Sequence, residues 1–166
     1  MECIDINSIK IIFDKEKTQK NITFYNEPCD CHYCKNYYKN MESNKELQDF
    51  LMQFGIDYLR CEEVISYDLG DDKDSLIESI AYYDVFGKIE REFSIKKYGH
   101  TISFKISENI NVEHEEDDEY FWIVIEASMP YVLDEERELP YVSSKRNIYY
   151  KIKQLFSKLF ETKTDK

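Results

Sequence analysis

The sequence Tyr120-Phe121-Trp122-Ile123-Val124-Ile125 is an unbroken apolar run that directly follows a mostly acidic segment, residues 113–119. Strands of a half-exposed sheet alternate apolar and polar residues, whereas a strand buried on both faces does not. The run therefore predicts the central strand of a sheet. Pro130 lacks a backbone N–H and predicts where regular pairing ends. The acidic segment predicts a solvated loop that protects a sheet edge.

Upstream of this run, several strand-like segments follow one another. Residues 80–86 are rich in Tyr and Val, and residues 89–95 and 101–106 alternate apolar with polar side chains. Residues 96–100 separate two of these segments and predict a turn. Alternation with a period of two is typical of antiparallel strands with one face in water. These segments therefore predict a central meander.

The N-terminal segment predicts a hairpin. Residues 4–13 have the pattern of a strand with a bulge near Asn7. Residues 14–20 are polar and predict a turn, and residues 21–25 predict the second strand, antiparallel to the first.

Helical signals follow in the next part of the chain. Ser43 and Glu46 have the spacing of a capping box, and Gly55 lies where a helix C-cap is expected. The apolar stripe between them has helical spacing and consists of Leu47, Phe50, Leu51 and Phe54. Asp57 predicts the cap of a short second helix that extends to about Ser66.

Residues 143–160 predict a last helix, which is amphipathic and basic. Its apolar stripe consists of Ile148, Ile152, Leu155, Phe156, Leu159 and Phe160. Such a helix binds a membrane surface, a partner groove or its own sheet, and we favour the sheet because a half-exposed sheet needs a cover.

These patterns together predict an α+β fold. Its mainly antiparallel sheet consists of the N-terminal hairpin plus the central meander, and two or three helices cover one face. Residues 1–160 form the predicted single domain, and residues 161–166 form a frayed C-terminal tail.

Three of the five cysteines, Cys29, Cys31 and Cys34, lie within six residues. Their C-x-C-x-x-C spacing favours a zinc site, because closely spaced thiolates can occupy adjacent corners of a tetrahedron. No second Cys-x-x-Cys or His-x-x-x-His pair follows. The remaining donors outside the cluster are isolated in the sequence and comprise Cys3, Cys61, His100 and His114. The three clustered cysteines are therefore candidate ligands of Zn, without an assigned fourth ligand.

Two other interpretations of the cluster stay open. Residues 33–40 predict a short helix, which would place Cys31 and Cys34 near a helix N-terminus that lowers a thiol pKa. Thiol–disulfide oxidoreductases use this arrangement, although within a βαβ unit that the antiparallel pattern does not match. Alternatively, the cysteines are reduced and partly buried, and act as small apolar residues at a turn. In each case Asp30 is the predicted helix cap.

The formal net charge of −12 is unevenly distributed. Residues 1–60 carry 8 basic and 10 acidic groups, residues 61–142 carry 7 and 22, and residues 143–166 carry 7 and 2. The middle segment thus has a net charge of −15. A strongly acidic surface repels nucleic acid and attracts basic proteins. The sequence therefore predicts a protein partner, a basic one on charge grounds, and no nucleic-acid partner.

Other features indicate a cytoplasmic bacterial protein. No basic and apolar leader is visible, and no apolar run reaches the ~18 residues of a membrane span. An odd number of cysteines without an export signal indicates reduced thiols. Abundant Lys, Asn, Ile and Glu suggests an AT-rich bacterial genome. Neither a glycine-rich nucleotide-binding motif nor a nucleophile elbow is present, so catalysis is not predicted.

The run Cys29-Asp30-Cys31-His32-Tyr33-Cys34-Lys35-Asn36-Tyr37 resembles a C-D-C-x-x-C-x-N block of a family of small acidic bacterial proteins without an assigned function. Gly55-Ile56-Asp57 and Met129-Pro130-Tyr131-Val132-Leu133 resemble two further blocks, so the likeness spans residues 25–135. The resemblance implies a cytosolic single domain and implies no activity.

The leading functional hypothesis is a non-catalytic protein-interaction domain, of an immunity-like, antitoxin-like or regulatory kind, that uses its acidic surface. The alternative is a zinc-binding domain organised by Cys29, Cys31 and Cys34. A thiol–disulfide oxidoreductase ranks third.

Overall fold

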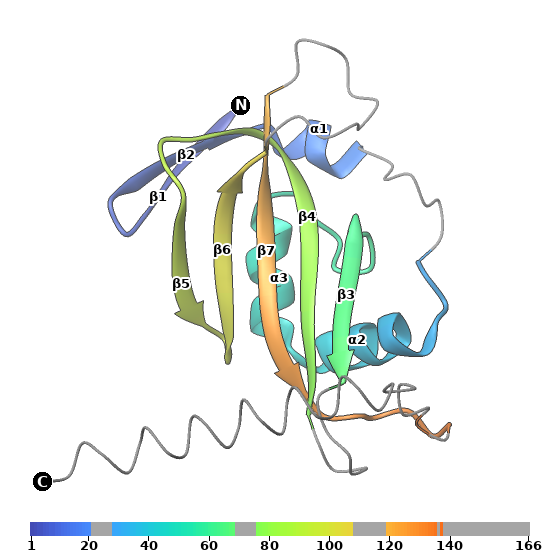
Figure 1. Ribbon diagram of the computed structural model, residues 1–166. Helices are drawn as coiled ribbons and strands as arrows, with labels where there is room; N and C mark the ends of the chain where they lie inside the picture. Colours follow the sequence, from blue (N-terminus) through green and yellow to red (C-terminus); the bar gives the residue numbers. More distant parts are fainter. Residues whose placement is uncertain (21–27, 69–75, 108–118, 136, 138–166) are drawn as a thin grey trace, which may run out of the picture.

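The computed structural model describes residues 1–20, 28–68, 76–107, 119–135 and 137 (Figure 1). Within these residues, seven strands form an antiparallel sheet and three helices accompany it. The predicted α+β fold with a mainly antiparallel sheet is therefore confirmed, and an N-terminal hairpin is present.

The elements follow one another along the chain with strands at both ends. The strands are β1 Glu2–Ile6, β2 Ile9–Phe13, β3 Glu63–Asp68, β4 Ile77–Ile89, β5 Phe93–Lys97, β6 His100–Ile106 and β7 Tyr120–Met129. The helices are α1 Lys15–Lys20, α2 His32–Ser43 and α3 Lys45–Gln53. The strand order is β1-β2-β4-β7-β6-β5, and β3 also pairs with β4. β4 is thus shared by β3, β7 and β2.

β7 lies in the interior of the sheet, as its apolar run predicts. It pairs with β4 along its whole length and with β6 on its other side. Ile123 and Ile125 are fully buried on one face, and Val124 is only 4% exposed on the other. Because β7 lies between β4 and β6, β4 and β5 follow each other in the chain without pairing, and the predicted meander is confirmed only for β5 with β6.

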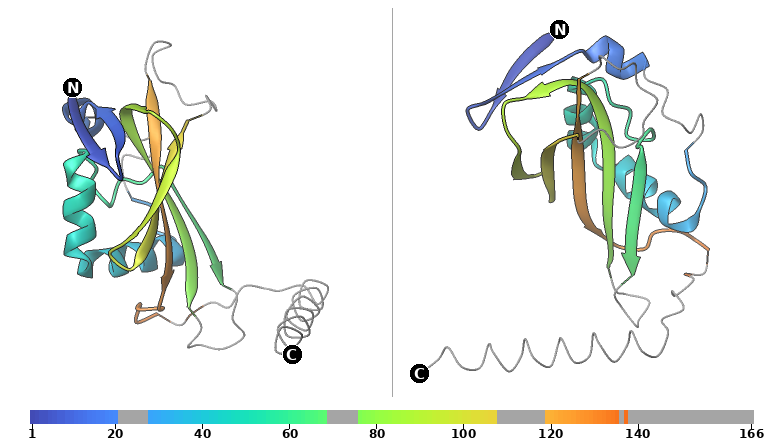
Figure 2. Two further views of the ribbon diagram at one scale, coloured as in Figure 1. Left: turned by 90° about the vertical axis from the view of Figure 1, so that its left-hand side faces the viewer. Right: turned by 45° about the horizontal axis from the view of Figure 1, so that its top comes forward.

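One face of the sheet packs against the helices, as predicted, and Figure 2 shows α2 and α3 together on that side. The ring centroid of Phe54, the C-cap of α3, lies 6.0 Å from that of Phe104 on β6, and Tyr83 of β4 is fully buried in the same core. No described helix covers the other face, on which the rings of Tyr82 and Trp122 are in edge contact.

α3 matches its predicted apolar stripe, while its start differs by one residue. The stripe residues Leu47, Phe50, Leu51 and Phe54 are all buried, and Gly55 follows with a φ of +86°, as expected of a C-cap glycine. The N-cap is Asn44, whose side chain accepts a hydrogen bond from the Leu47 N–H at 3.2 Å. The predicted cap on Ser43 is wrong, because Ser43 is the last residue of α2.

The N-terminal hairpin is shorter than predicted. β1 and β2 are joined by Asn7 and Ser8, whose φ angles of 51° and 61° are typical of a two-residue type I′ turn. The continuous strand with a bulge was therefore a wrong prediction. The polar residues that follow form α1 instead of a turn, and Asp14 accepts a hydrogen bond from the Lys17 N–H at 2.9 Å. The predicted strand 21–25 lies outside the described residues.

The short helix predicted after Asp57 is wrong. The Asp57 side chain accepts a hydrogen bond from the Leu59 N–H at 3.0 Å, but only a turn forms, and β3 begins at Glu63. Val64 and Ile65 are β-branched and favour a strand. The free edge of β4 supplies backbone partners for six residues of β3, which outweighs a single cap signal.

Several predicted segments lie outside the described residues, namely the acidic segment 113–118, the last helix 143–160 and the tail 161–166. The domain boundary at residue 160 stays a prediction. Among the helices of the described part of the chain, none is long and apolar enough to cross a membrane.

Gly87 is the residue at which β4 leaves β7 and begins to pair with β2. Its φ is +144°, and a Cβ atom there would lie 2.1 Å from the carbonyl oxygen of Ile12. We expect Gly87→Ala to lower the free energy of unfolding by about 3 kcal/mol or more, because backbone strain and a backbone clash add. Urea denaturation monitored by circular dichroism measures this loss.

Gly99→Ala is the matched control. Gly99 also has a positive φ, +81°, but a Cβ atom there would meet nothing within 4 Å. Its substitution should cost only about 1–2 kcal/mol. Equal losses in the two variants would show that the close approach of β2 is not what requires glycine at position 87.

Candidate metal centre

The three cysteines predicted as metal ligands lie together. The sulfur atoms of Cys29, Cys31 and Cys34 are all within 4.8 Å of one another. Cys34 is buried, whereas Cys29 and Cys31 are exposed, and all three are free thiols. The cluster therefore has one buried corner and two corners that solvent reaches.

The start of α2 brings the cluster together. Cys31 is the N-cap of this helix, and Cys34 lies three residues later on the first turn, so both point to the same side. The Cys31 carbonyl accepts a hydrogen bond from the Lys35 N–H at 2.9 Å, which closes that turn. The predicted cap on Asp30 is wrong, because the N-cap of α2 is Cys31, which makes no side-chain cap bond.

The pKa values of Cys31 and Cys34 are shifted in opposite directions. Partial burial acts to raise the pKa of Cys31, but hydrogen bonds from the backbone and thiol of Cys34 and from Cys29 outweigh it and lower the pKa. Burial, together with the neighbouring sulfurs, raises the pKa of Cys34 well above its usual range. Of these two thiols, Cys31 therefore loses its proton more readily, and a bound cation would favour the thiolate form of each ligand.

A cavity of about 550 Å³ borders the cluster between the start of α2 and the residues before β3. Its wall includes Cys29, Cys34 and Cys61. The buried Cys61 sulfur lies 3.2 Å from the hydroxyl of Tyr38. Burial raises the pKa of Cys61 to about 11, although the Tyr38 hydrogen bond acts in the opposite direction.

Other potential donors, apart from Cys61, contact residues outside the cluster or lie elsewhere. His32 directs its Nδ1 to the Glu135 carboxylate at 3.3 Å and to the hydroxyl of Tyr131 at 3.5 Å. His100 contacts the side chain of Asn44, and Cys3 is exposed on β1. His114 lies outside the described residues. Among the isolated donors in the described part of the chain, Cys61 is the one that lines the cluster's cavity.

A buried asparagine on α2 fixes the helix relative to the chain after β7. Asn36 is 0% exposed, and its Nδ2 donates to the Pro130 carbonyl at 3.1 Å. Its Oδ1 accepts a hydrogen bond from the Val132 N–H at 2.8 Å. Asn40, one turn later, donates to the same Pro130 carbonyl at 3.0 Å. These bonds hold the helix that carries Cys34.

Comparisons with protein-family models, curated proteins and solved structures give no match to this chain. The resemblance to a family of small acidic bacterial proteins stays a prediction.

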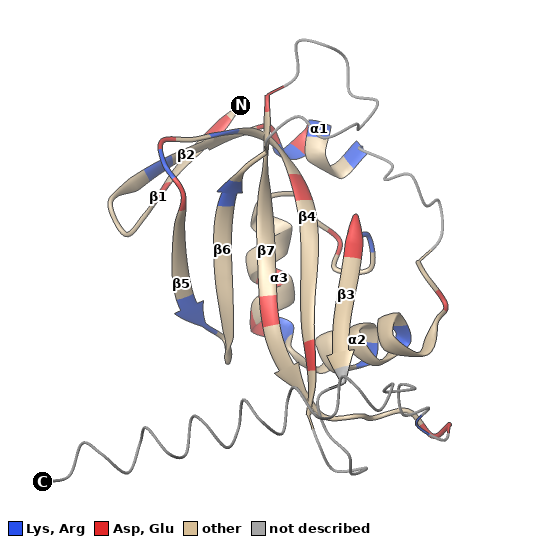
Figure 3. Ribbon diagram, viewed as in Figure 1, with Lys and Arg blue, Asp and Glu red and all other residues tan. Residues whose placement is uncertain are grey.

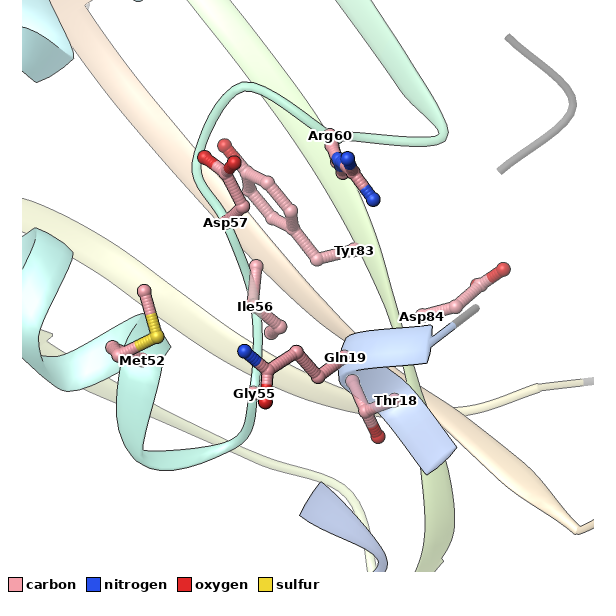
Figure 4. A pocket seen from close by; sticks show the side chains of 9 residues that line it. All are labelled: Thr18, Gln19, Met52, Gly55, Ile56, Asp57, Arg60, Tyr83 and Asp84. Carbon is pink, nitrogen blue, oxygen red and sulfur yellow. The ribbon is translucent and has the colours of Figure 1, made fainter. Parts of the chain in front are cut away.

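A second, smaller cavity of about 260 Å³ lies between α1, the loop after α3 and β4 (Figure 4). Tyr83 and Asp84 project to opposite sides of β4 there. The Tyr83 hydroxyl donates to the Tyr58 carbonyl at 3.0 Å. Asp84 is only 7% exposed, and burial raises its pKa to about 6, although a hydrogen bond from Trp122 acts to lower it.

This buried carboxyl makes the stability depend on pH. Because the folded state raises the pKa of Asp84, the folded protein binds this proton more tightly than the unfolded chain. Stability therefore decreases as the pH rises from about 4 to about 6 and stays lower above that range. We expect Asp84→Asn to be more stable than the wild type by about 2–3 kcal/mol at neutral pH and equally stable near pH 4.

Urea denaturation across that pH range measures the difference. Asp49→Asn is the control, because Asp49 is exposed on α3 and its replacement should change stability little at any pH. A difference between wild type and Asp84→Asn that is constant with pH would contradict the argument.

Proposed function

We propose that this protein binds zinc through Cys29, Cys31 and Cys34 and uses the metal as a structural element. The observation that supports the proposal most directly is the mutual approach of three sulfur atoms to within 4.8 Å. In a tetrahedral zinc–thiolate site, neighbouring sulfurs are about 3.8 Å apart, which follows from a Zn–S distance of about 2.3 Å. The distances between the three sulfur atoms would therefore have to shorten by about 1 Å or less to bind the ion.

Zinc fits these donors better than a hard cation does. Thiolates are soft ligands that select Zn, Cu(I) or iron–sulfur clusters, whereas Mg²⁺ and Ca²⁺ require oxygen ligands. Within the proposed site, the metal would fasten the segment that contains Cys29 to the first turn of α2. That helix also contributes Tyr37 and Met41 to the core, both 0% exposed. Metal binding would thereby stabilise the fold.

A thiol-exchange activity is the competing proposal for the same cysteines. Cys31 is exposed with a lowered pKa and Cys34 is buried with a raised pKa, an asymmetry that suits an attacking and a resolving thiol. The third sulfur, that of Cys29, has no role in such a pair. Its presence within the cluster is the reason why we favour metal binding.

Metal analysis of the full-length protein tests the proposal. We expect about one zinc per chain after reconstitution and dialysis, and loss of that zinc in Cys34→Ser, because a buried corner of the site is removed. Cys3→Ser is the matched control. Because Cys3 is exposed on β1, this variant should retain the metal. Wild-type protein that keeps no zinc, but reduces a model disulfide in a reaction abolished by Cys31→Ser, would favour thiol exchange instead.

We also propose that the face of the sheet that no described helix covers binds a basic protein surface, in an immunity-like, antitoxin-like or regulatory role. Three strands contribute half-buried apolar side chains to this face, and these are Ile65, Ile80, Tyr82 and Trp122. They form one continuous patch, because Ile65 pairs with Ile80 and Trp122 is in ring contact with Tyr82. A half-buried apolar patch of this kind favours a protein partner.

Acidic residues surround this patch. Glu63 and Glu126 are exposed and Glu78 is half-buried, and Figure 3, in which the strands lie in front of α2 and α3, shows acidic residues on β3, β4 and β7. Lys105 on β6 is the basic neighbour of Trp122. Of the 22 acidic residues in 61–142, 11 belong to the described part of the chain.

Charge reversal on this face tests the second proposal. We expect a partner retained on the immobilised protein at low salt to be basic, to dissociate at high salt and to be lost in Glu126→Lys. Asp49→Lys, on the exposed side of α3, is the control and should retain it. Binding that is indifferent to salt, or equally weakened by both substitutions, would count against this face.

A further inference from the structure

The three clustered cysteines leave one corner of a zinc tetrahedron without a protein ligand. Structural zinc sites almost always have four protein ligands. The missing donor must therefore come from a side chain that faces the cluster. In the described part of the chain, the cavity beside the cluster shows which side chains do so.

That cavity is lined by Cys29 and Cys34 on one side and by Cys61, Glu62 and Glu63 on the other. Cys61 is 8% exposed, whereas Glu63 is exposed to solvent. A buried sulfur is the better partner for a site that already has three sulfurs, because thiolate ligands favour the same soft ions. A carboxylate on the rim would give a site open to water.

We propose that Cys61 is the fourth ligand. The result is a four-cysteine zinc centre between the start of α2 and the segment that precedes β3. This inference rests on the proposed zinc site. The Cys61 sulfur is not part of the group of sulfurs within 4.8 Å, so ligation requires the two sides of the cavity to approach each other. The volume of about 550 Å³ between them provides the room for that movement.

The contact between Tyr38 and Cys61 supports this role. The Tyr38 hydroxyl lies 3.2 Å from the Cys61 sulfur, and Tyr38 follows Cys34 by one turn on α2. A hydroxyl that donates to a ligating sulfur stabilises its thiolate form and fixes its direction. The same helix would thus supply two ligands directly and orient a third through Tyr38.

The proposed ligand joins parts of the fold that the cluster alone does not. Cys29, Cys31 and Cys34 belong to one local segment, whereas Cys61 precedes the edge strand β3, which pairs with β4. A metal bound by all four residues would link α2 to the edge of the sheet through coordination bonds. Closing a loop of this length restricts the unfolded chain more than closing a local turn does.

X-ray absorption at the zinc edge of the full-length, zinc-loaded wild type tests the inference without any substitution. We expect four sulfur neighbours at about 2.3 Å. Three sulfurs with one oxygen or nitrogen neighbour would overturn the role of Cys61 and leave the three-cysteine site intact. A wild-type protein that retains no zinc would overturn both this inference and the proposed zinc site.

Zinc competition with a chromophoric chelator provides the second measurement. We expect Cys61→Ser to weaken zinc binding on the order of a hundredfold, and Cys3→Ser to leave it unchanged. Tyr38→Phe should weaken it about tenfold, because it removes only the hydrogen bond to the ligating sulfur. Wild-type affinity in Cys61→Ser would overturn the inference, while a loss of zinc in Cys34→Ser alone would support the three-cysteine site.

Discussion

The buried amide of Asn36 is the contact on which the arrangement of the cysteine cluster depends. Its Nδ2 and Oδ1 bond to the backbone at Pro130 and Val132, and the side chain is 0% exposed. A buried amide that loses its partners costs about 1–3 kcal/mol, so α2 and the chain after β7 keep this relative position. The rotation of α2 about its axis is set in this way. Cys34 belongs to the same helix, and its side chain is buried and lines the cavity.

Local patterns predict those elements that their own residues determine. The apolar run of β7, the stripe of α3 and Gly55 at its C-terminus were all predictable for this reason. The partners of each strand are not, because β4 and β7 pair across residues 90–119 and no local signal specifies which edges meet. The Asp57 cap signal failed in the same way. There, a local cap competes with pairing to the edge of β4. The residues around Asp57 carry no signal of that pairing, because β4 begins only at Ile77.

The candidate metal centre likewise contains some residues that local sequence predicts and one that it does not. Cys29, Cys31 and Cys34 are close in the chain, so their spacing alone predicts that their sulfurs can meet, and they do. Cys61 has no such signal. It reaches the cavity because β3 pairs with β4 and because Tyr38 projects from α2 toward it. The position of Asp84 was likewise not predictable, since its burial depends on Trp122 of β7 and on the packing of α1.

The place of β7 in the sheet has a consequence for synthesis of the protein. The strand that fills the gap between β4 and β6 is the last of the seven to leave the ribosome. Until it emerges, β4 pairs only with β2 and β3, β6 pairs only with β5, and the edges of β4 and β6 that β7 later occupies stay open. Exposed edges of this kind pair readily with other chains. We therefore expect newly made chains to be most prone to aggregate before residues 120–129 emerge from the ribosome, because the two parts of the sheet can join only then.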